Sequence, residues 1–413
     1  MRVINTVEKL KKDTKLCLFI IWLIALCLRA CQLVLHYGES FVSGLVLPQI
    51  QAANSLLDGQ GLIVNGSTLG DPPGMAAVLF LLWKIFPRGA VFPLELLQAL
   101  IDSSMVFLVF SIFRTWRGEF SAWIAASAYA IYLPQAYLAT RLNHYTWAVW
   151  FSVIFIYLAV SRKGSPVKMG MLAGLGMYFR SELLVVPFFW VIARWPLMRE
   201  RLSRVIIAGV LSLAGILVIV LPWSFYNLTH EGSPRLIRHS FWLSFYAGLI
   251  STSPFFASAD NVTDEMLDEA ARKLRYMGSV DTGYTRIMRD LSIKHMKEKP
   301  LDFPKGVMRR FVRVWHLNSV WGIENWFSPG SIPDYMMKIS KKLLTILSTF
   351  IGFYFFLKWG RKNPELLAAG LGIIAGLGAV YCALHMSYLY LMSFRWLIYC
   401  CFCAGVAQAL CER

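Results

Sequence analysis

Residues 16–35 read LCLFIIWLIALCLRACQLVL, an apolar run whose single charged side chain is Arg29. A bilayer core of about 30 Å is crossed by about 20 helical residues, so this run predicts a transmembrane helix. It is too long for the apolar part of a signal peptide, and no small-residue cleavage site follows it. Residues 1–15 are basic, so we predict an uncleaved first helix whose basic end lies in the cytoplasm.

The composition of the whole chain is that of a membrane protein. Of its 413 residues, 57% are hydrophobic and 16% are charged, whereas soluble domains have about 45–50% apolar and about 25% charged residues. A soluble globular enzyme is therefore excluded. The net charge of +17 suits anionic headgroups or lipid phosphates, and we expect no nucleic-acid partner. All eight cysteines lie in or beside apolar runs, which indicates neither a disulfide framework nor a zinc site.

Hydropathy predicts nine further spans, and the ten together predict an all-α polytopic membrane protein. Lysine and arginine gather in loops on the side of the N-terminus, as the positive-inside tendency requires. Two short spans meet at Arg180-Ser181-Glu182, a charged corner typical of broken helices at a buried polar site. The nine further spans are 91–113, 120–138, 146–160, 169–180, 183–197, 204–225, 343–358, 365–384 and 394–410.

Two long segments on the predicted outer side divide the chain into three parts. An N-terminal membrane module, 1–225, contains the first outer loop, 36–90, and an outer region with interfacial helices, 226–342, precedes the C-terminal transmembrane helices, 343–413. Some helical stretches in these segments are too short or too polar to span a bilayer, which predicts juxtamembrane helices. The expected helices are Gln49–Leu57, Met75–Phe86, Thr263–Met277, Tyr284–Lys299 and a basic-aromatic surface helix at 305–316.

The candidate catalytic residues are ionisable side chains near the predicted outer face, where a charge is costly unless it is paired or functional. Glu39 follows the first helix. Its carboxylate would accept a proton from an attacking hydroxyl, and the other interpretation is a solvated loop acid. Asp71 precedes Pro-Pro-Gly and is a second candidate, although aspartate before proline commonly only starts a turn. Asp102, inside the second span, is more typical of a helix-packing contact than of a catalyst.

The candidate substrate-binding residues are mostly arginines, because a guanidinium group matches phosphate oxygens bidentately. Arg180 is expected either to clamp a phosphate or to pair with Glu182. Arg395, at the start of the last span, either binds an anion or extends to the headgroups. Arg235 and Arg238 follow the exit of a span and would contact a lipid pyrophosphate or headgroups.

A series of short motifs extends along most of the chain. They are Arg29, 52–59 (AANSLLDG), Pro72-Pro73-Gly74, 96–100 (LLQAL), Arg180, 221–227 (LPWSFYN), 245–248 (FYAG) and Phe394-Arg395. In the order and spacing of these motifs, the chain resembles the polytopic glycosyltransferases that use polyprenyl-phosphate sugar donors. This group, the GT-C fold superfamily, includes aminoarabinose transferases and protein O-mannosyltransferases (glycosyltransferase family 39).

The resemblance implies a GT-C-like fold and inverting transfer of a sugar to an envelope lipid, glycan or protein, with an acid of the first outer loop as base. It places that role on Glu39. The acid of the family usually lies closer to the segment that corresponds to 52–59, so a few residues are inserted between Glu39 and that segment here. A second acid of the family commonly follows the third span, where this chain has 141–145 (RLNHY). His144 would substitute there as proton acceptor or acceptor-binding group, and Arg141 joins the candidate substrate-binding residues. Arg180, Arg395 and Arg238 would neutralise the leaving phosphate.

No cofactor is implied, and although some relatives use a divalent metal, no tight acid cluster here requires one. The expected location is a bacterial inner membrane, with both termini in the cytoplasm and the active face in the periplasm or outside. Two other classes stay open. A lipid-linked sugar transporter or flippase would more often show inverted repeats, and the missing second acid favours a non-catalytic subunit of polysaccharide assembly.

Overall fold

The computed structural model describes residues 14–36, 47–64, 67–69, 72–161, 163–231, 242, 245–246, 249, 282–314, 331–383 and 392–412. Among these described residues, the one sheet is an antiparallel hairpin of two short strands, β1 (Ile63–Val64) and β2 (Ser67–Thr68). The α-helices are α2 (Thr14–Leu35), α3 (Leu47–Leu57), α4 (Gly74–Trp83), α5 (Phe92–Arg117), α6 (Glu119–Ala130), α7 (Leu133–Ala139), α8 (Tyr145–Val160), α9 (Pro166–Met177), α10 (Val186–Met198), α11 (Leu202–Glu231), α14 (Thr282–Glu298), α15 (Asp302–Val314), α16 (Ile332–Gly360), α17 (Pro364–Ala383) and α18 (Met392–Cys411). A 3₁₀ helix, η1 (Ser181–Val185), precedes α10.

The predicted class, an all-α polytopic membrane protein, is confirmed. Within the described residues, seven helical segments are long and apolar enough to cross a membrane: α2, α5, η1 with α10, α11, α16, α17 and α18. The predicted count of ten is not confirmed, because the other three spans correspond to shorter helices. The span predicted at 120–138 is divided into α6 and α7, since Tyr132 leaves the helical conformation (φ −70°, ψ 91°). Pro134 then stands in the first turn of α7, where its missing N–H breaks no helical hydrogen bond.

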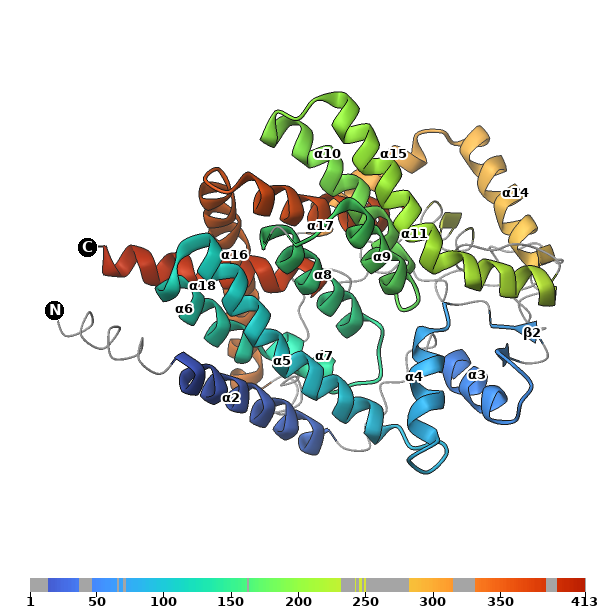
Figure 1. Cartoon of the computed structure of the whole chain (residues 1–413), viewed down its shortest axis with the longest axis horizontal. Helices are drawn as coiled ribbons and strands as arrows, with labels where there is room; N and C mark the ends of the chain where they lie inside the picture. Colours follow the sequence, from blue (N-terminus) through green and yellow to red (C-terminus); the bar gives the residue numbers. More distant parts are fainter. Residues whose placement is uncertain are drawn as a thin grey trace.

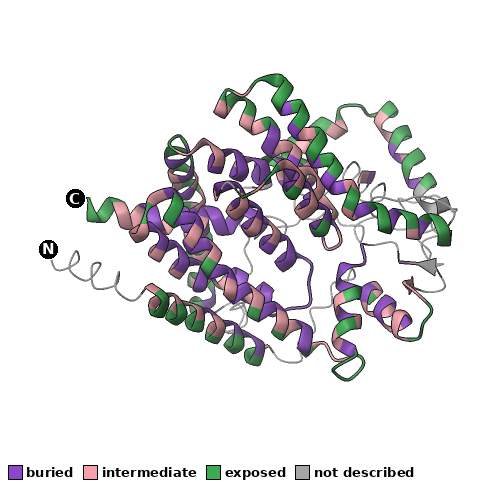
Figure 2. Cartoon of the chain, in the orientation of Figure 1, coloured by how far each residue is buried: buried purple, intermediate pink, exposed green. Residues whose placement is uncertain are grey.

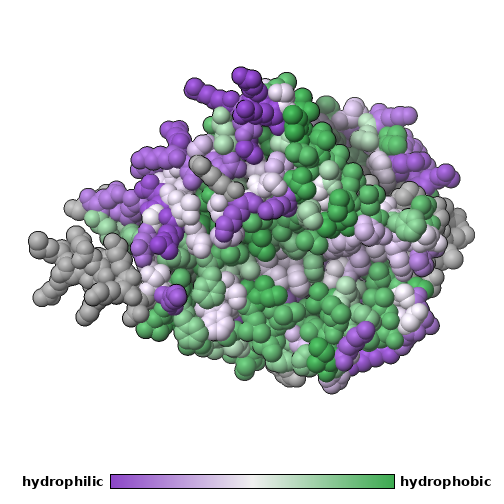
Figure 3. All heavy atoms as spheres, in the orientation of Figure 1, coloured by the Kyte–Doolittle hydropathy of each residue, from purple (hydrophilic) through white to green (hydrophobic). Residues whose placement is uncertain are grey.

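Helices α2, α5, α17 and α18 lie roughly along the long axis of the molecule, whereas α4 and α16 run across it (Figure 1). The start of α2 and the end of α18 lie at one end, here called the terminal end, and α3, α4 and β2 lie at the opposite end, here called the loop end. Buried residues face the interior of the bundle (Figure 2), and apolar residues form a broad face across its middle (Figure 3). On α2, Leu16, Phe19 and Leu23 are exposed at helical spacing. Such a stripe on a bundle of this composition is a lipid-facing surface.

Glycines allow a close contact between helices α9 and α11. A Cβ atom added to Gly170 would lie 2.0 Å from the carbonyl oxygen of Ser212, and one added to Gly215 would lie 2.2 Å from that of Val167. Helices in membranes commonly associate through such glycines, because the backbones can then make direct van der Waals contact. The chain after the break at Arg180 therefore returns against α9 through α11.

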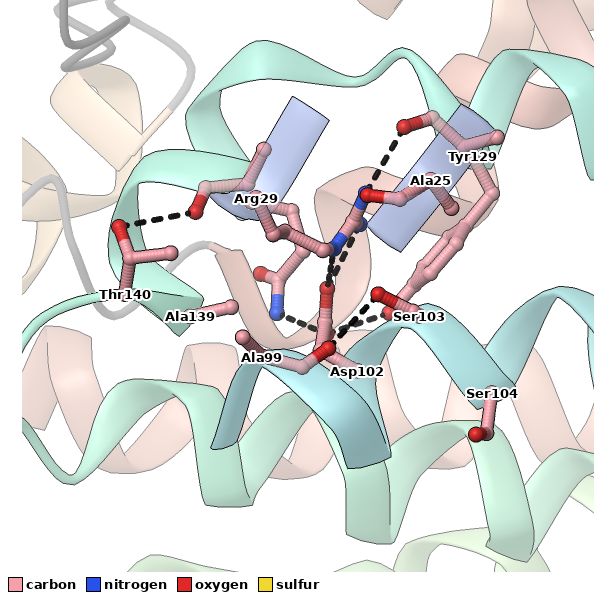
Figure 4. Close-up of polar contacts among 12 residues, drawn as sticks. Ala25, Arg29, Ala99, Asp102, Ser103, Ser104, Tyr129, Ala139 and Thr140 are labelled. Carbon is pink, nitrogen blue, oxygen red and sulfur yellow. Dashed lines mark hydrogen bonds and ion pairs between the residues drawn. The ribbon is translucent and has the colours of Figure 1, made fainter. Parts of the chain in front are cut away.

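A buried ion pair joins the first two long helices (Figure 4). Arg29 on α2 donates through Nε to Asp102 Oδ2 on α5 at 2.8 Å, and its Nη2 lies 2.7 Å from the same oxygen. Both side chains are 0% exposed. The other carboxylate oxygen accepts hydrogen bonds from Tyr129, Gln135 and Trp150. Asp102 is thus the packing contact that its position predicted, and it links α2, α5, α6, α7 and α8.

Helices outside the long spans agree in part with expectation. The predicted helix Gln49–Leu57 is α3, and the short helix expected at Met75–Phe86 is α4. In the second outer segment, the helices expected at 284–299 and 305–316 correspond to α14 and α15, with α15 beginning three residues earlier than expected, whereas 263–277 lies outside the described residues. Helix α15 is held by Arg310, whose Nε donates to the carbonyl oxygen of Cys382 at the end of α17 (2.5 Å). Exposed Met308 and Phe311 lie beside Lys305 and Arg309, a composition typical of an interfacial helix.

Candidate functional site

The predicted break in the helix at Arg180 is confirmed. Helix α9 ends at Met177 and η1 begins at Ser181, with Arg180 in an extended conformation (φ −146°, ψ 106°). Residues two apart do not share a face of an α-helix, but the extended residue turns the two side chains together. Arg180 and Glu182 therefore form a mostly buried ion pair. The pairing with Glu182, expected as one of two alternatives for Arg180, is present.

Tyr178 joins this break to the first outer loop. Its carbonyl oxygen accepts a hydrogen bond from the N–H of Gly74 at 2.7 Å, and its hydroxyl donates to the carbonyl oxygen of Ile219 on α11 at 2.6 Å. Gln49 on α3 fixes the same turn, because its amide donates to Pro72 O and accepts from the N–H of Ala76. Two motifs of the resemblance, Pro72-Pro73-Gly74 and Arg180, are thereby brought together from distant positions in the sequence.

Gly74→Ala is expected to destabilise the protein by about 1–3 kcal/mol, as overpacking of a tight contact does. The new Cβ would lie 2.5 Å from the carbonyl oxygen of Tyr178, so α4 would have to move away from the break. Thermal unfolding in detergent measures the effect. Gly209→Ala is the matched control, because nothing lies within 4 Å of the Cβ position there. Equal stability of the two variants would contradict the contact.

The start of α8 is fixed by Asn143. Its side-chain oxygen accepts hydrogen bonds from the N–H groups of Tyr145 (2.8 Å) and Thr146 (3.1 Å), and its amide donates to Leu138 O and Arg141 O. Asparagine is a favoured N-terminal capping residue, and an asparagine just before an apolar run is the signal that sequence reasoning missed. Asn143 holds Arg141 and His144, which are both buried, in the turn directly before α8.

Four of the predicted site residues meet around this turn. Arg141 donates from Nη1 to the carbonyl oxygen of His36, the residue after α2, at 3.0 Å. Arg180 lies with its guanidinium carbon 5.0 Å from the ring centre of Tyr145, directly after His144. Cation–π contacts of this kind hold a guanidinium group while leaving its N–H groups for other partners. Arg141, His144, Arg180 and Glu182 therefore belong to one region.

Arg395 lies in the first turn of α18 and is 8% exposed. It interacts electrostatically with Tyr132 at the corner between α6 and α7, and the ring of Tyr132 stacks on that of Tyr399 at 4.6 Å. Among the described residues, no carboxylate forms an ion pair with Arg395, and its buried Nη1 atom has no hydrogen-bond partner. A buried arginine in this situation is suited to an anionic ligand.

Four candidates lie outside the described residues: Glu39, Asp71, Arg235 and Arg238. One carboxylate that sequence reasoning did not consider is placed near the site. Glu95, in the first turn of α5, is partly buried and interacts electrostatically with Arg141. Its signal in the sequence was an acid at the start of a predicted span, a position where acids often only favour the helix N-terminus.

Asp58, in the AANSLLDG motif, forms an ion pair with Arg88. Arg88, in the loop between α4 and α5, donates to both carboxylate oxygens of Asp58 and to the side chain of Asn54. The hydrogen bond from Arg88 lowers the pKa of Asp58. Both partners are about half exposed, so the pair is expected to add little stability. It ties the end of α3 to the loop that leads into α5.

No protein-family model and no curated protein matches this sequence. Solved structures with the same fold include the archaeal oligosaccharyltransferase AglB from Archaeoglobus fulgidus in complex with an inhibitory peptide and a dolichol-phosphate. It has a TM-score of 0.54 and 12% identity, over 97% of this chain and 51% of that chain. The Archaeoglobus fulgidus enzyme tethered with an acceptor peptide containing the NVT sequon has a TM-score of 0.53 and 16% identity, over 97% and 50%. Its apo form has a TM-score of 0.52 and 13% identity, over 96% and 51%.

The chain thus spans about half the length of these structures. Nearly all of this chain is matched. At such low identity the likeness establishes the fold alone. The fold that the motifs led us to expect is confirmed.

Proposed function

We propose that this protein is an inverting membrane glycosyltransferase that moves a sugar from a polyprenyl-phosphate donor to an envelope lipid, glycan or protein. The observation that carries the proposal is the shared fold over 97% of the chain with a protein solved with a dolichol-phosphate. Arg141 and Arg180, which lie near the start of α8, support the proposal. The loop end would face the periplasm or exterior of a bacterial inner membrane, with both termini in the cytoplasm.

The donor phosphate would be bound by Arg395 and Arg180. A buried guanidinium group without a carboxylate partner matches a phosphate in charge and in hydrogen-bond geometry. Arg395 meets this condition among the described residues. Arg180 already pairs with Glu182, and that pair would orient its remaining N–H groups. Arg141 lies in the same region, and Arg235 and Arg238 would add positive charge from the segment after α11.

The proposed reaction is a single displacement at the anomeric carbon. The hydroxyl oxygen of the acceptor forms a bond to that carbon while the carboxylate of Glu39 or Asp71 takes the hydroxyl proton. The bond between the anomeric carbon and the phosphate oxygen breaks, and its electron pair leaves with the phosphate. The arginines stabilise the charge that develops on this oxygen. His144 is the further candidate for holding the acceptor or for receiving its proton.

The test offers the purified protein a panel of radiolabelled polyprenyl-phosphate sugars and measures release of polyprenyl phosphate. Turnover is expected with at least one donor, and loss of the general base is expected to lower kcat by about 10²–10⁴-fold. Glu39→Gln, Asp71→Asn and Glu95→Gln identify that base. Glu119→Gln is the matched control, because Glu119 begins α6 directly after α5, at the opposite end of α5 from Glu95. Tight donor binding without turnover would instead indicate a carrier or a non-catalytic subunit.

A further inference from the structure

We propose that Gln98 is a positioning residue that holds the start of α8 and the break at Arg180 in a fixed relation. The inference rests on the proposed function, because these two segments carry Arg141, His144 and Arg180. Both segments are irregular backbone. Each needs contacts from a regular helix to keep its arginine in one place.

Gln98 lies in the second turn of α5 and is 0% exposed. Its Nε2 donates to the carbonyl oxygen of Arg141 at 2.7 Å, and its Oε1 accepts from the indole N–H of Trp147 at 3.2 Å. One amide thus contacts both Arg141, two residues before the capping Asn143, and Trp147 in the first turn of α8. Rotating the amide by half a turn would set donor against donor and acceptor against acceptor, so the arrangement has one orientation.

Trp147 connects Gln98 to the break at Arg180 by packing. Its ring stacks on Phe179, the residue before Arg180, with a centroid separation of 4.0 Å and an interplanar angle of 12°. Trp147 also packs edge-on against Trp150 at 4.5 Å, and Trp150 donates to Asp102. The indole is therefore enclosed between the buried Asp102 network and the break, and Gln98 fixes its N–H edge.

The chemistry of the residue matters because the site needs a donor and an acceptor at once. A methionine would fill the same volume and form neither hydrogen bond. A glutamate would set a carboxylate against the carbonyl oxygen of Arg141. Loss of two buried hydrogen bonds is expected to weaken binding at the site about tenfold.

The experiment measures two quantities for wild type, Gln98→Met and Trp147→Phe. The first is the Kd for a radiolabelled long-chain polyprenyl phosphate, with phosphatidic acid as the anionic lipid for comparison. The second is hydrogen–deuterium exchange in peptides covering 141–147 and 178–184. We expect Gln98→Met to raise Kd about tenfold and to speed exchange in both peptides. Trp147→Phe keeps an aromatic ring beside Phe179 but loses the N–H and part of the ring area, and we expect it to raise Kd about threefold.

Gln135→Met is the matched control, since Gln135 is also 0% exposed and donates to Asp102 instead. It should leave exchange in both peptides near wild type. In an Arg180→Ala background, Gln98→Met should raise Kd by a smaller factor than in the wild type, because one of the arginines that Gln98 positions is absent.

Faster exchange in one peptide only, or in neither, would overturn the positioning role. So would full additivity with Arg180→Ala. If both peptides exchange faster and the wild type binds polyprenyl phosphate no better than phosphatidic acid, the coupling through Gln98 stands and the proposed donor is wrong.

Discussion

Asp102→Leu is expected to destabilise the protein by about 3–5 kcal/mol, the cost of leaving a buried charge without its partner. Arg29 would remain 0% exposed with its carboxylate removed. Tyr129, Gln135 and Trp150 would lose their acceptor as well. Reversible unfolding in detergent, or the shift of the thermal midpoint, measures the loss.

The double variant Arg29→Met/Asp102→Leu separates the charge effect from general disruption. Replacing both members of a buried pair with apolar side chains is often close to neutral, so the double variant should be more stable than Asp102→Leu alone. Asp290→Leu is the surface control, because Asp290 and its partner Arg289 are about half exposed. We expect it to change the free energy of unfolding by less than about 0.5 kcal/mol. Additive losses in the double variant would show that the two side chains do not act as a pair.

Arg180→Ala is expected to raise KM for the donor by about 10- to 100-fold, the range for losing hydrogen bonds to a charged group. Glu182→Gln should change KM less than about threefold, since its effect on the phosphate is indirect. Arg180→Lys should fall between them, because lysine keeps the charge but lacks the planar fork. Steady-state kinetics of polyprenyl phosphate release, for a donor found to turn over, provide the measurement.

The comparison decides between the two interpretations of Arg180. If its role were only to pair with Glu182, removal of either partner would have the same effect on activity and on stability. A larger effect of Arg180→Ala on KM, with equal thermal midpoints, supports contact with the donor. Arg361→Ala is the control for loss of positive charge, because Arg361 is an exposed residue at the end of α16.

Local composition was sufficient to predict much of the architecture. A continuous apolar run forms a helix in lipid because all its backbone polar groups must bond internally, and this determined α2, α5, α11, α17 and α18. The pattern at Gln49–Leu57 determined α3, and the charged corner at Arg180 marked the break. Each of these features depends on neighbours within about 20 residues, which a sequence displays directly.

Partners far apart in the sequence were decided by the tertiary structure. Arg29 and Asp102 are 73 residues apart. Hydropathy indicates that burying either charge alone costs free energy, but it does not show that the two side chains form a pair. Gln98 was visible only as part of a motif until the fold set its amide between Arg141 and Trp147. The division of 120–138 into α6 and α7 likewise escaped an apolarity count, because that count does not register where the backbone leaves the helix. Hydropathy measures how much a segment gains from leaving water, whereas the packing of distant segments determines which buried polar groups satisfy one another.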